Sequence, residues 1–315
     1  MTTILVTGSL GQIGTELIPL LKSKGYTVIS TDIRKPTDTT VFDPFEILDS
    51  RDKERMRNLV RDYSVDYIIH NASLLSATAE KNPQLAIDIN IGGIQNVLEV
   101  AREEKIKRVL SPSSIAAFGP NSPKEMTPND TVMRPNTIYG VSKIYTELLG
   151  EYYHQKYDVD FRTLRYPGII SAGAEPGGGT TDWAVQIFYD AILNGKYTCF
   201  VDHDVRMPMM SMQDCLKSTI MLLEAPQEVL KHRSFNVSGC NFTPEELTEE
   251  IKKYIPDFQI EYAPDFRQDI ALSWPKSIDD SVARAEWNWE PDYDIEKLTK
   301  YMLDTLKTKL TKQDI

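Results

Sequence analysis

The chain begins with the stretch MTTILVTGSLGQIGTELIPLLKSKGYTVISTD, residues 1–32, and this stretch decides the fold. A short apolar run ends at Gly8, and a helical pattern starts at Gln12 and continues to about Lys24. A second β-rich run then ends on Asp32. Strand, glycine turn, helix, strand and acid follow one another as in a dinucleotide-binding unit. We therefore predict an α/β protein with a Rossmann-type, doubly wound parallel sheet.

The glycine turn has the spacing that a bound pyrophosphate requires. Gly8 allows the tight turn, Gly11 lets the backbone approach the phosphates, and Gly14 lets helix and strand pack closely. The N–H groups at the start of the helix carry the positive end of its dipole and face the phosphates. The predicted phosphate-binding residues are Gly8, Gly11, Gln12, Ile13 and Gly14.

The end of the second strand predicts which dinucleotide binds. Asp32 can accept hydrogen bonds from both hydroxyls of an adenosine ribose and would repel a 2′-phosphate, which favours NAD over NADP. Arg34 is the one hint in the other direction, and Ile33 belongs to the same predicted contact region. Farther along, Glu46 and Ile47 fall in a connection that passes near the adenine in such folds. Glu46 either accepts from the adenine amino group or is an ordinary solvated acid.

The composition excludes several functional classes. Hydrophobic residues make up 41% and charged residues 26% of the 315 residues, as in an ordinary soluble globular protein. The net charge of −11 argues against a nucleic-acid-binding surface. No apolar run is long enough to span a membrane. The strand that follows Met1 directly leaves no room for a signal peptide, so a cytoplasmic location is expected.

The cysteines and histidines do not have the spacing of metal ligands, so a zinc-dependent enzyme is not expected. Scattered cysteines fit a reducing compartment without disulfides. These residues are Cys199, Cys215, Cys240, His70, His154, His203 and His232.

Polar residues follow the next predicted strand, residues 65–69, where ligands bind in doubly wound sheets. Asn71, Ala72 and Ser73 are therefore expected to line the cofactor groove. Ser76 either contacts the substrate or simply caps a turn. Asn90 interrupts the apolar face of a long helix pattern over residues 83–105, and a polar group there needs a buried partner. Asn90 is also expected among the cofactor-binding residues.

A candidate acid–base set follows in the middle of the chain. Tyr139 and Lys143 lie four residues apart in the run PNTIYGVSK and so share one helix face. That spacing is common by chance, but Ser114 ends a preceding predicted strand and completes a Ser–Tyr–Lys set. The strand over residues 161–166 then brings Tyr166, and the turn after it Ile169, to the same edge of the sheet, where both are expected to contact the cofactor.

These features together resemble the extended short-chain dehydrogenase/reductase superfamily, which includes UDP-galactose 4-epimerase. Several runs look most like its NAD-dependent L-threonine 3-dehydrogenase branch: GSLGQIGTELIPLL, SLLSATAEKNP, PSSIAAFGP, MRPNTIYGVSK, RYPGIIS and GGGTTDWAVQIFYDA. The resemblance implies that Ser114 and Tyr139 are catalytic, that Lys143 binds the ribose and that Thr181 contacts the substrate. Glu46 stands where the superfamily usually has Asp, which weakens the predicted adenine contact.

The resemblance implies oxidation of the Cβ hydroxyl of L-threonine to 2-amino-3-ketobutyrate, with hydride transfer to NAD and Tyr139 as the base. One alternative is a UDP-sugar 4-epimerase, which uses the same three residues. A second is a non-catalytic NAD-sensing protein, although such relatives typically lose the Tyr or the Lys. The family also implies a homodimer that pairs through helices 83–105 and 137–157.

The rest of the chain is expected to bind the substrate. Residues 1–170 are predicted to form the NAD-binding domain, with a return segment near 197–237, and residues 171–315 mainly a smaller α/β lobe and lid. The glycine-rich run 171–181 is read as a hinged lid, followed by a helix over 182–193 that Thr180 or Thr181 caps.

Three tryptophans complete the prediction for this lobe. Trp274 either closes over a small ligand or packs in the core. Trp287 and Trp289 are expected to anchor the small lobe.

Overall fold

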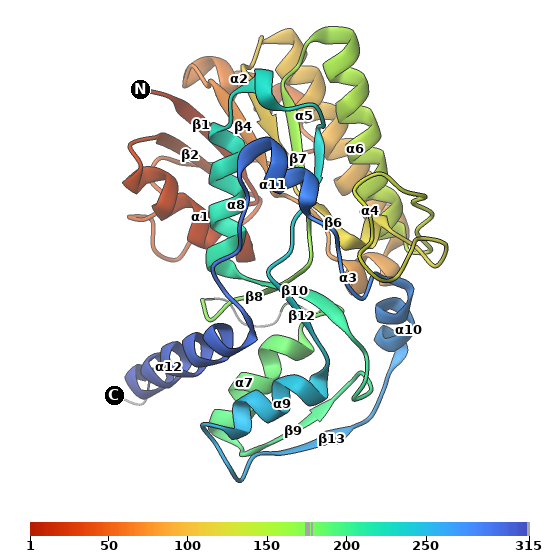
Figure 1. Ribbon diagram of the computed structural model, residues 1–315. Helices are drawn as coiled ribbons and strands as arrows, with labels where there is room; N and C mark the ends of the chain where they lie inside the picture. Colours follow the sequence, from red (N-terminus) through yellow and green to blue (C-terminus); the bar gives the residue numbers. More distant parts are fainter. Residues whose placement is uncertain (174–176, 178, 314–315) are drawn as a thin grey trace.

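The computed structural model describes residues 1–173, 177 and 179–313 and contains the predicted parallel sheet (Figure 1). The strand order is β11-β7-β5-β4-β1-β2-β3, with β6 beside β7, and every neighbouring pair is parallel. The strands are β1 Thr3–Thr7, β2 Thr27–Asp32, β3 Phe45–Ile47, β4 Tyr67–His70, β5 Arg108–Leu110, β6 Ser113–Ser114, β7 Phe161–Tyr166 and β11 Ser234–Asn236.

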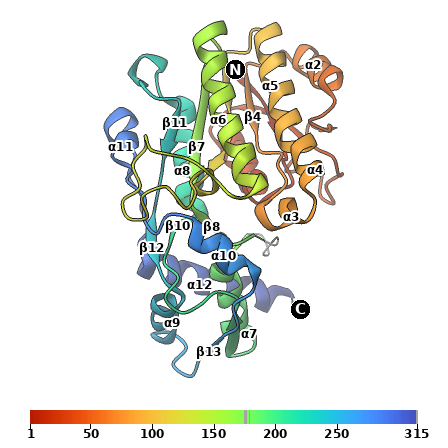
Figure 2. The same cartoon turned by 90° about the vertical axis from the view of Figure 1, so that its right-hand side faces the viewer.

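Helices cover both faces of this sheet (Figure 2). One layer contains α2, α5 and α6, and the opposite layer contains α1, α8 and α11. Central β1 is apolar along its middle because both of its faces are covered, and Ile4, Leu5 and Val6 are fully buried. The helices are α1 Gln12–Ser23, α2 Lys53–Asp62, α5 Gly92–Glu103, α6 Ile138–Tyr157, α8 Met212–Glu224 and α11 Ser281–Trp287.

The glycine turn after β1 adopts the predicted close packing. Gly8 has a φ of +65°, and a Cβ there would lie 2.7 Å from the backbone nitrogen of Ala72. A Cβ on Gly14 would lie 2.5 Å from the carbonyl oxygen of Gly8. Side chains at either position would push α1 and the β4 loop away from the turn.

A smaller lobe lies below the carboxyl edge of the large sheet (Figure 1). It contains a three-stranded sheet of order β12-β10-β8 and a parallel pair, β13 with β9. Its strands are β8 Gly168–Ile170, β9 Lys196–Cys199, β10 Met207–Ser211, β12 Cys240–Phe242 and β13 Gln259–Tyr262. Its helices are α7 Trp183–Leu193, α9 Pro244–Lys252, α10 Phe266–Ser273 and α12 Ile295–Gln313. β11 belongs to the large sheet and lies within the predicted return segment, residues 197–237. The domain boundary at residue 170 remains a prediction.

The predicted helix over 83–105 is interrupted. It starts after the short α3 (Ser76–Lys81) as α4 (Pro83–Ala86), widens into the π-helix η1 (Ile87–Ile91) and continues as α5. Asn90 lies in the π-helical turn, and its amide bonds to a neighbouring loop. Two 3₁₀ turns, η2 Ile115–Ala117 and η3 Gln227–Val229, complete the described elements.

Two predictions for the C-terminal half were wrong. The residue at the cap position of α7 is Asp182 and not Thr180 or Thr181. The Thr180 hydroxyl forms a hydrogen bond with the Ser76 hydroxyl instead. Trp287 and Trp289 do not anchor the small lobe, because they pack with Phe235 of β11 against the core of the large sheet.

The lid remains a prediction, because residues 174–176 and 178 lie outside the described residues. Within the described part of the chain, no helix combines the length and apolar character that crossing a membrane requires.

Candidate active site

Two adjoining cavities open at the carboxyl ends of β1 and β4, where the topology predicts ligand binding. The first encloses about 1070 Å³ and the second about 830 Å³. Both are lined by Gly8, Gly11, Asn71 and Ser73, so they meet at the glycine turn. Together they form one site that extends to both sides of the glycine turn.

The second cavity contains the residues predicted to select the adenosine half. Asp32, Ile33, Arg34 and Ala72 line it. Asp32 is only 7% exposed, and its carboxylate accepts hydrogen bonds from the backbone nitrogens of Leu10 and Arg34, both at 3.1 Å. The acid is therefore held in a fixed position at the end of β2.

Glu46 and Ile47 do not line either cavity. The Glu46 carboxylate binds Arg55 at 2.6 Å and the Tyr63 hydroxyl at 2.8 Å, which holds it against α2. The segment Leu48–Arg51, just beyond β3, lines the cavity instead. Asp49 is the acid in that segment, so Asp49 borders the cavity and Glu46 does not.

Asn71 provides the clearest evidence that these residues fit a dinucleotide. Neither its side-chain oxygen nor its side-chain nitrogen has a hydrogen-bond partner among the described residues, although both atoms are buried. Buried amides almost always have partners. Because Asn71 lines both cavities, polar groups of a bound dinucleotide would complete its hydrogen bonds.

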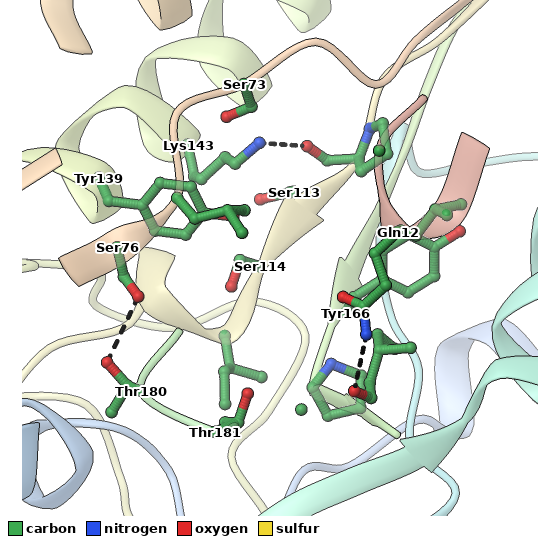
Figure 3. Close-up of a pocket in the computed structure, with 18 of the residues that line it drawn as sticks. Gln12, Ser73, Ser76, Ser113, Ser114, Tyr139, Lys143, Tyr166, Thr180 and Thr181 are labelled. Carbon is green, nitrogen blue, oxygen red and sulfur yellow. Dashed lines mark hydrogen bonds between the residues drawn. The ribbon is translucent and has the colours of Figure 1, made fainter. Parts of the chain in front are cut away.

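The first cavity contains the predicted acid–base set (Figure 3). Thr137 caps α6 by accepting a hydrogen bond from the backbone nitrogen of Gly140 at 3.1 Å, which fixes the turn that carries Tyr139. Lys143 follows one turn later, with its ammonium 5.2 Å from the centre of the Tyr139 ring. That ammonium also donates to the carbonyl oxygen of Pro112 at 2.9 Å, and Ser114 ends β6 beside it.

Burial shifts the pKa values of Tyr139 and Lys143 in the directions that favour the neutral form of each group. It raises the pKa of Tyr139 to about 12, and a hydrogen bond with Ser114 acts in the opposite direction. Burial lowers the pKa of Lys143 to about 8, and the negative charge of Glu147 acts in the opposite direction by raising it. The site therefore needs further positive charge near Tyr139 before the phenolate forms near neutral pH.

The other end of this cavity is lined with hydroxyl groups (Figure 3). Ser76 Oγ and Thr180 Oγ1 lie 3.3 Å apart, and Thr181 lies beside them. Trp274 is 5% exposed and forms part of the wall, so it both packs in the lobe and faces the cavity. Lys124 holds this wall by donating to the carbonyl oxygens of Leu272, Ser273 and Trp274.

Comparison with known proteins agrees with this geometry. The profile of the NAD dependent epimerase/dehydratase family matches residues 4–238, which span the glycine turn, the Ser–Tyr–Lys set and β11. The chain belongs to this family. In this epimerase/dehydratase protein, the matched segment therefore contains every described lining residue of the two cavities except Trp274, and it ends just after β11.

Similar relatives extend the match to nearly the whole chain. L-threonine 3-dehydrogenase of Sus scrofa mitochondria is 48% identical over 96% of this chain and 82% of its own length. An uncharacterised epimerase/dehydratase of Staphylococcus saprophyticus is 48% identical over 98% of both chains. The crystal structure of L-threonine dehydrogenase from Phytophthora infestans is 50% identical over 98% of this chain and 100% of its own, with a TM-score of 0.95.

The remaining predicted residues support or border the epimerase/dehydratase site. Asn90 lines neither cavity, but its amide bonds to both backbone groups of Leu74 and to Ser142, so it positions the loop after β4. Gln12 donates to the carbonyl oxygen of Ile169 at 3.4 Å and so connects the glycine turn to β8. Tyr166 lines the cavity, and its hydroxyl pairs with Thr219.

Sequence reasoning missed three polar residues of the catalytic cavity. Ser113 lines it next to Ser114, and Thr180 and Asp182 line it just before α7. The repeated serine in SPSS and the acid after Thr181 were visible signals, but neither one showed which way its side chain would point. The Asp182 carboxylate also accepts from the backbone nitrogen of Gly179 at 2.7 Å.

Proposed function

We propose that this protein is an NAD-dependent L-threonine 3-dehydrogenase that oxidises the Cβ hydroxyl of L-threonine to 2-amino-3-ketobutyrate. The observation that supports this proposal most directly is that Tyr139, Lys143 and Ser114 face one cavity beside the glycine turn. The relatives of that name, about half identical along nearly the whole chain, supply the substrate.

NAD, bound between Gly8, Asn71 and Asp32, would accept the hydride and bring the positive charge of its oxidised ring to the site. Tyr139 removes the proton from the substrate hydroxyl, and Ser114 holds the reacting oxygen by a hydrogen bond. Forming the phenolate near pH 8 from a pKa of about 12 costs about 5 kcal/mol. A positive charge about 4 Å away supplies about 1–4 kcal/mol, so Lys143 provides part of the stabilisation and cannot act alone.

The substrate end of the cavity offers partners for an amino acid. The hydroxyls of Ser76 and Thr181 can donate to a carboxylate. Asp182 is the one acidic side chain among the described residues that line this cavity. We assign it to the substrate ammonium, for which the sequence alone offered no partner.

The cavity favours this reaction over sugar-nucleotide epimerisation. Lys143 is the one basic side chain among the described residues that line it, and Lys143 already bonds to Pro112 beside Tyr139. A diphosphate at the substrate end would therefore lack a lysine or arginine to neutralise its charge.

The deciding assay follows NADH absorbance and ketone formation with purified protein, NAD and L-threonine. Equal amounts of NADH and ketone are expected. Conversion of a UDP-sugar without net NADH, together with no reaction of threonine, would overturn the assignment and favour the epimerase. NADP, run in parallel, tests the cofactor preference that Asp32 predicts.

We also propose a cytoplasmic homodimer that pairs through α6. Leu148, Val141 and Tyr152 on this helix are 59%, 44% and 45% exposed, an apolar exposure unusual for a helix that faces water. Ile94 and Leu98 of α5, in contrast, are buried in the core and cannot take part. Gel filtration should give a dimer, Leu148→Lys should shift it to monomer, and a wild-type monomer would refute the proposal.

A further inference from the structure

A buried ion pair lies directly behind the acid–base set. Glu147 follows Lys143 by one turn of α6. Two guanidinium nitrogens of Arg165 on β7 donate hydrogen bonds to the Glu147 carboxylate, at 2.7 and 3.0 Å. Both side chains are 4% exposed. Ser113 of β6 donates to the same carboxylate, so one buried group joins the helix that carries Tyr139 to the strand that carries Ser114.

Each partner of this carboxylate is itself fixed. Arg165 also donates to the carbonyl oxygen of Asn129 at 2.6 Å and to the side chain of Asn236 at 3.1 Å. The backbone nitrogen of Asn236 in turn donates to the Asn129 side chain at 2.8 Å. The network therefore connects α6, β6, β7 and β11, and Glu147 is its only member on the catalytic helix.

We infer that Glu147 is a positioning residue of the acid–base set: it lies one turn from Lys143 on α6, and its bonds to Ser113 and Arg165 fix that helix against the strand that carries Ser114. This inference rests on the proposed function. The surroundings of Lys143 support it. Tyr139 and Glu147 face it from α6 and His70 faces it from β4, while Arg165 of β7 pairs with the Glu147 carboxylate.

Two titratable neighbours, His70 and Glu147, decide how readily Lys143 keeps its proton. Burial lowers the pKa of His70 to about 3, so His70 is neutral at assay pH. Glu147 is then the one acid acting to raise the pKa of Lys143 against burial. Without that charge, Lys143 loses its proton at lower pH, and the positive charge that stabilises the Tyr139 phenolate disappears with it.

The test is the pH–rate profile of Glu147→Gln, compared with Glu147→Asp. Threonine oxidation needs Lys143 protonated, so its alkaline limb reports the loss of that proton. Glu147→Gln should move this limb to lower pH, by on the order of one pH unit. Glu147→Asp keeps the charge and should leave the limb in place even if its turnover falls. Glu151→Gln, an exposed acid one turn farther along α6, is the matched control and should match wild type.

A purely structural role predicts a different pattern. It would make Glu147→Asp at least as damaging as Glu147→Gln and leave both alkaline limbs at the wild-type pH, which would overturn the inference. If Glu147→Gln alone does not fold because Arg165 is left unpaired, the double variant Glu147→Gln/Arg165→Gln removes both buried charges. The double variant should still move the limb to lower pH, though by less than Glu147→Gln, because loss of the Arg165 charge offsets part of the loss of the Glu147 charge. An unshifted limb would again refute the inference.

A second readout does not need the enzyme to turn over. Acetylation of Lys143 by a small anhydride, followed across pH by mass spectrometry in protein without cofactor, reports how readily its ammonium loses a proton. Acetylation should begin at lower pH in Glu147→Gln than in wild type or Glu151→Gln, and identical curves would refute the inference. The acetylation experiment also separates the role of Glu147 from the proposed enzymatic activity. A protein that does not oxidise threonine would refute the proposed function, but its acetylation curves would still test the role of Glu147.

Discussion

The ammonium of Lys143 lies 5.2 Å from the centre of the Tyr139 ring, with both groups on the same face of α6. Because burial raises the pKa of Tyr139 to about 12, the phenolate depends on this neighbour and on the charge of an oxidised cofactor. Tyr139→Phe should therefore lower kcat by about 10²–10⁴-fold, the usual contribution of a general base. NADH titrations followed by fluorescence should give a Kd close to that of wild type, and undiminished turnover would exclude Tyr139 as the base.

Asp182 should determine the preference for an amino-acid substrate. Asp182→Asn should lower kcat/KM for L-threonine by about 10–100-fold, the worth of one charge-assisted hydrogen bond. (R)-3-hydroxybutyrate has the same reacting carbon without the ammonium, and its kcat/KM should not fall. An equal loss for both substrates would show that Asp182 acts only through its bond to Gly179.

Asp32 should control the choice between NAD and NADP. Asp32→Ala removes the buried carboxylate at the ribose end, so the Kd for NAD should rise by on the order of tenfold or more. NADP should bind better than it does to wild type, because Arg34 is already in place and the repulsion is lost. Isothermal titration with both dinucleotides measures this, and an unchanged NAD affinity would mean that the ribose is held elsewhere.

His70 should make the protein sensitive to acid. Its folded pKa of about 3 lies below the value of about 6.5 in an unfolded chain, so only the unfolded state binds the proton between these pH values. The free energy of unfolding should fall by about 1.4 kcal/mol per pH unit from this group as pH drops through that window. Urea unfolding of His70→Asn should show a shallower pH dependence than wild type, and parallel curves would contradict the shift.

The sequence predicted those parts of the site that depend on local spacing. The turn from Gly8 to Gly14 and the Tyr139–Lys143 pair are each encoded within a few residues, so their geometry follows from the strand, turn or helix that contains them. The need of Asn90 for a buried partner was also predictable, because it interrupts an apolar face. Its partners, Leu74 and Ser142, come from other segments and became visible only in the fold.

The errors arose where distant segments meet. The acid that borders the second cavity is Asp49 and not Glu46, because the end of a three-residue strand such as β3 cannot be read from an apolar pattern. Trp287 was assigned to the small lobe because the sequence does not show that the chain returns to the large sheet at α11. Glu147 was passed over because its importance depends on β6 and β7, which lie far from it along the chain.

The central claim is tested most directly by the initial rate of NADH formation from L-threonine, measured for wild type and Tyr139→Phe in one assay with NAD in excess. The account predicts steady NADH production by the wild type and a rate lower by at least two orders of magnitude in the variant. No NADH from wild type with L-threonine, or equal rates for the two proteins, would contradict it.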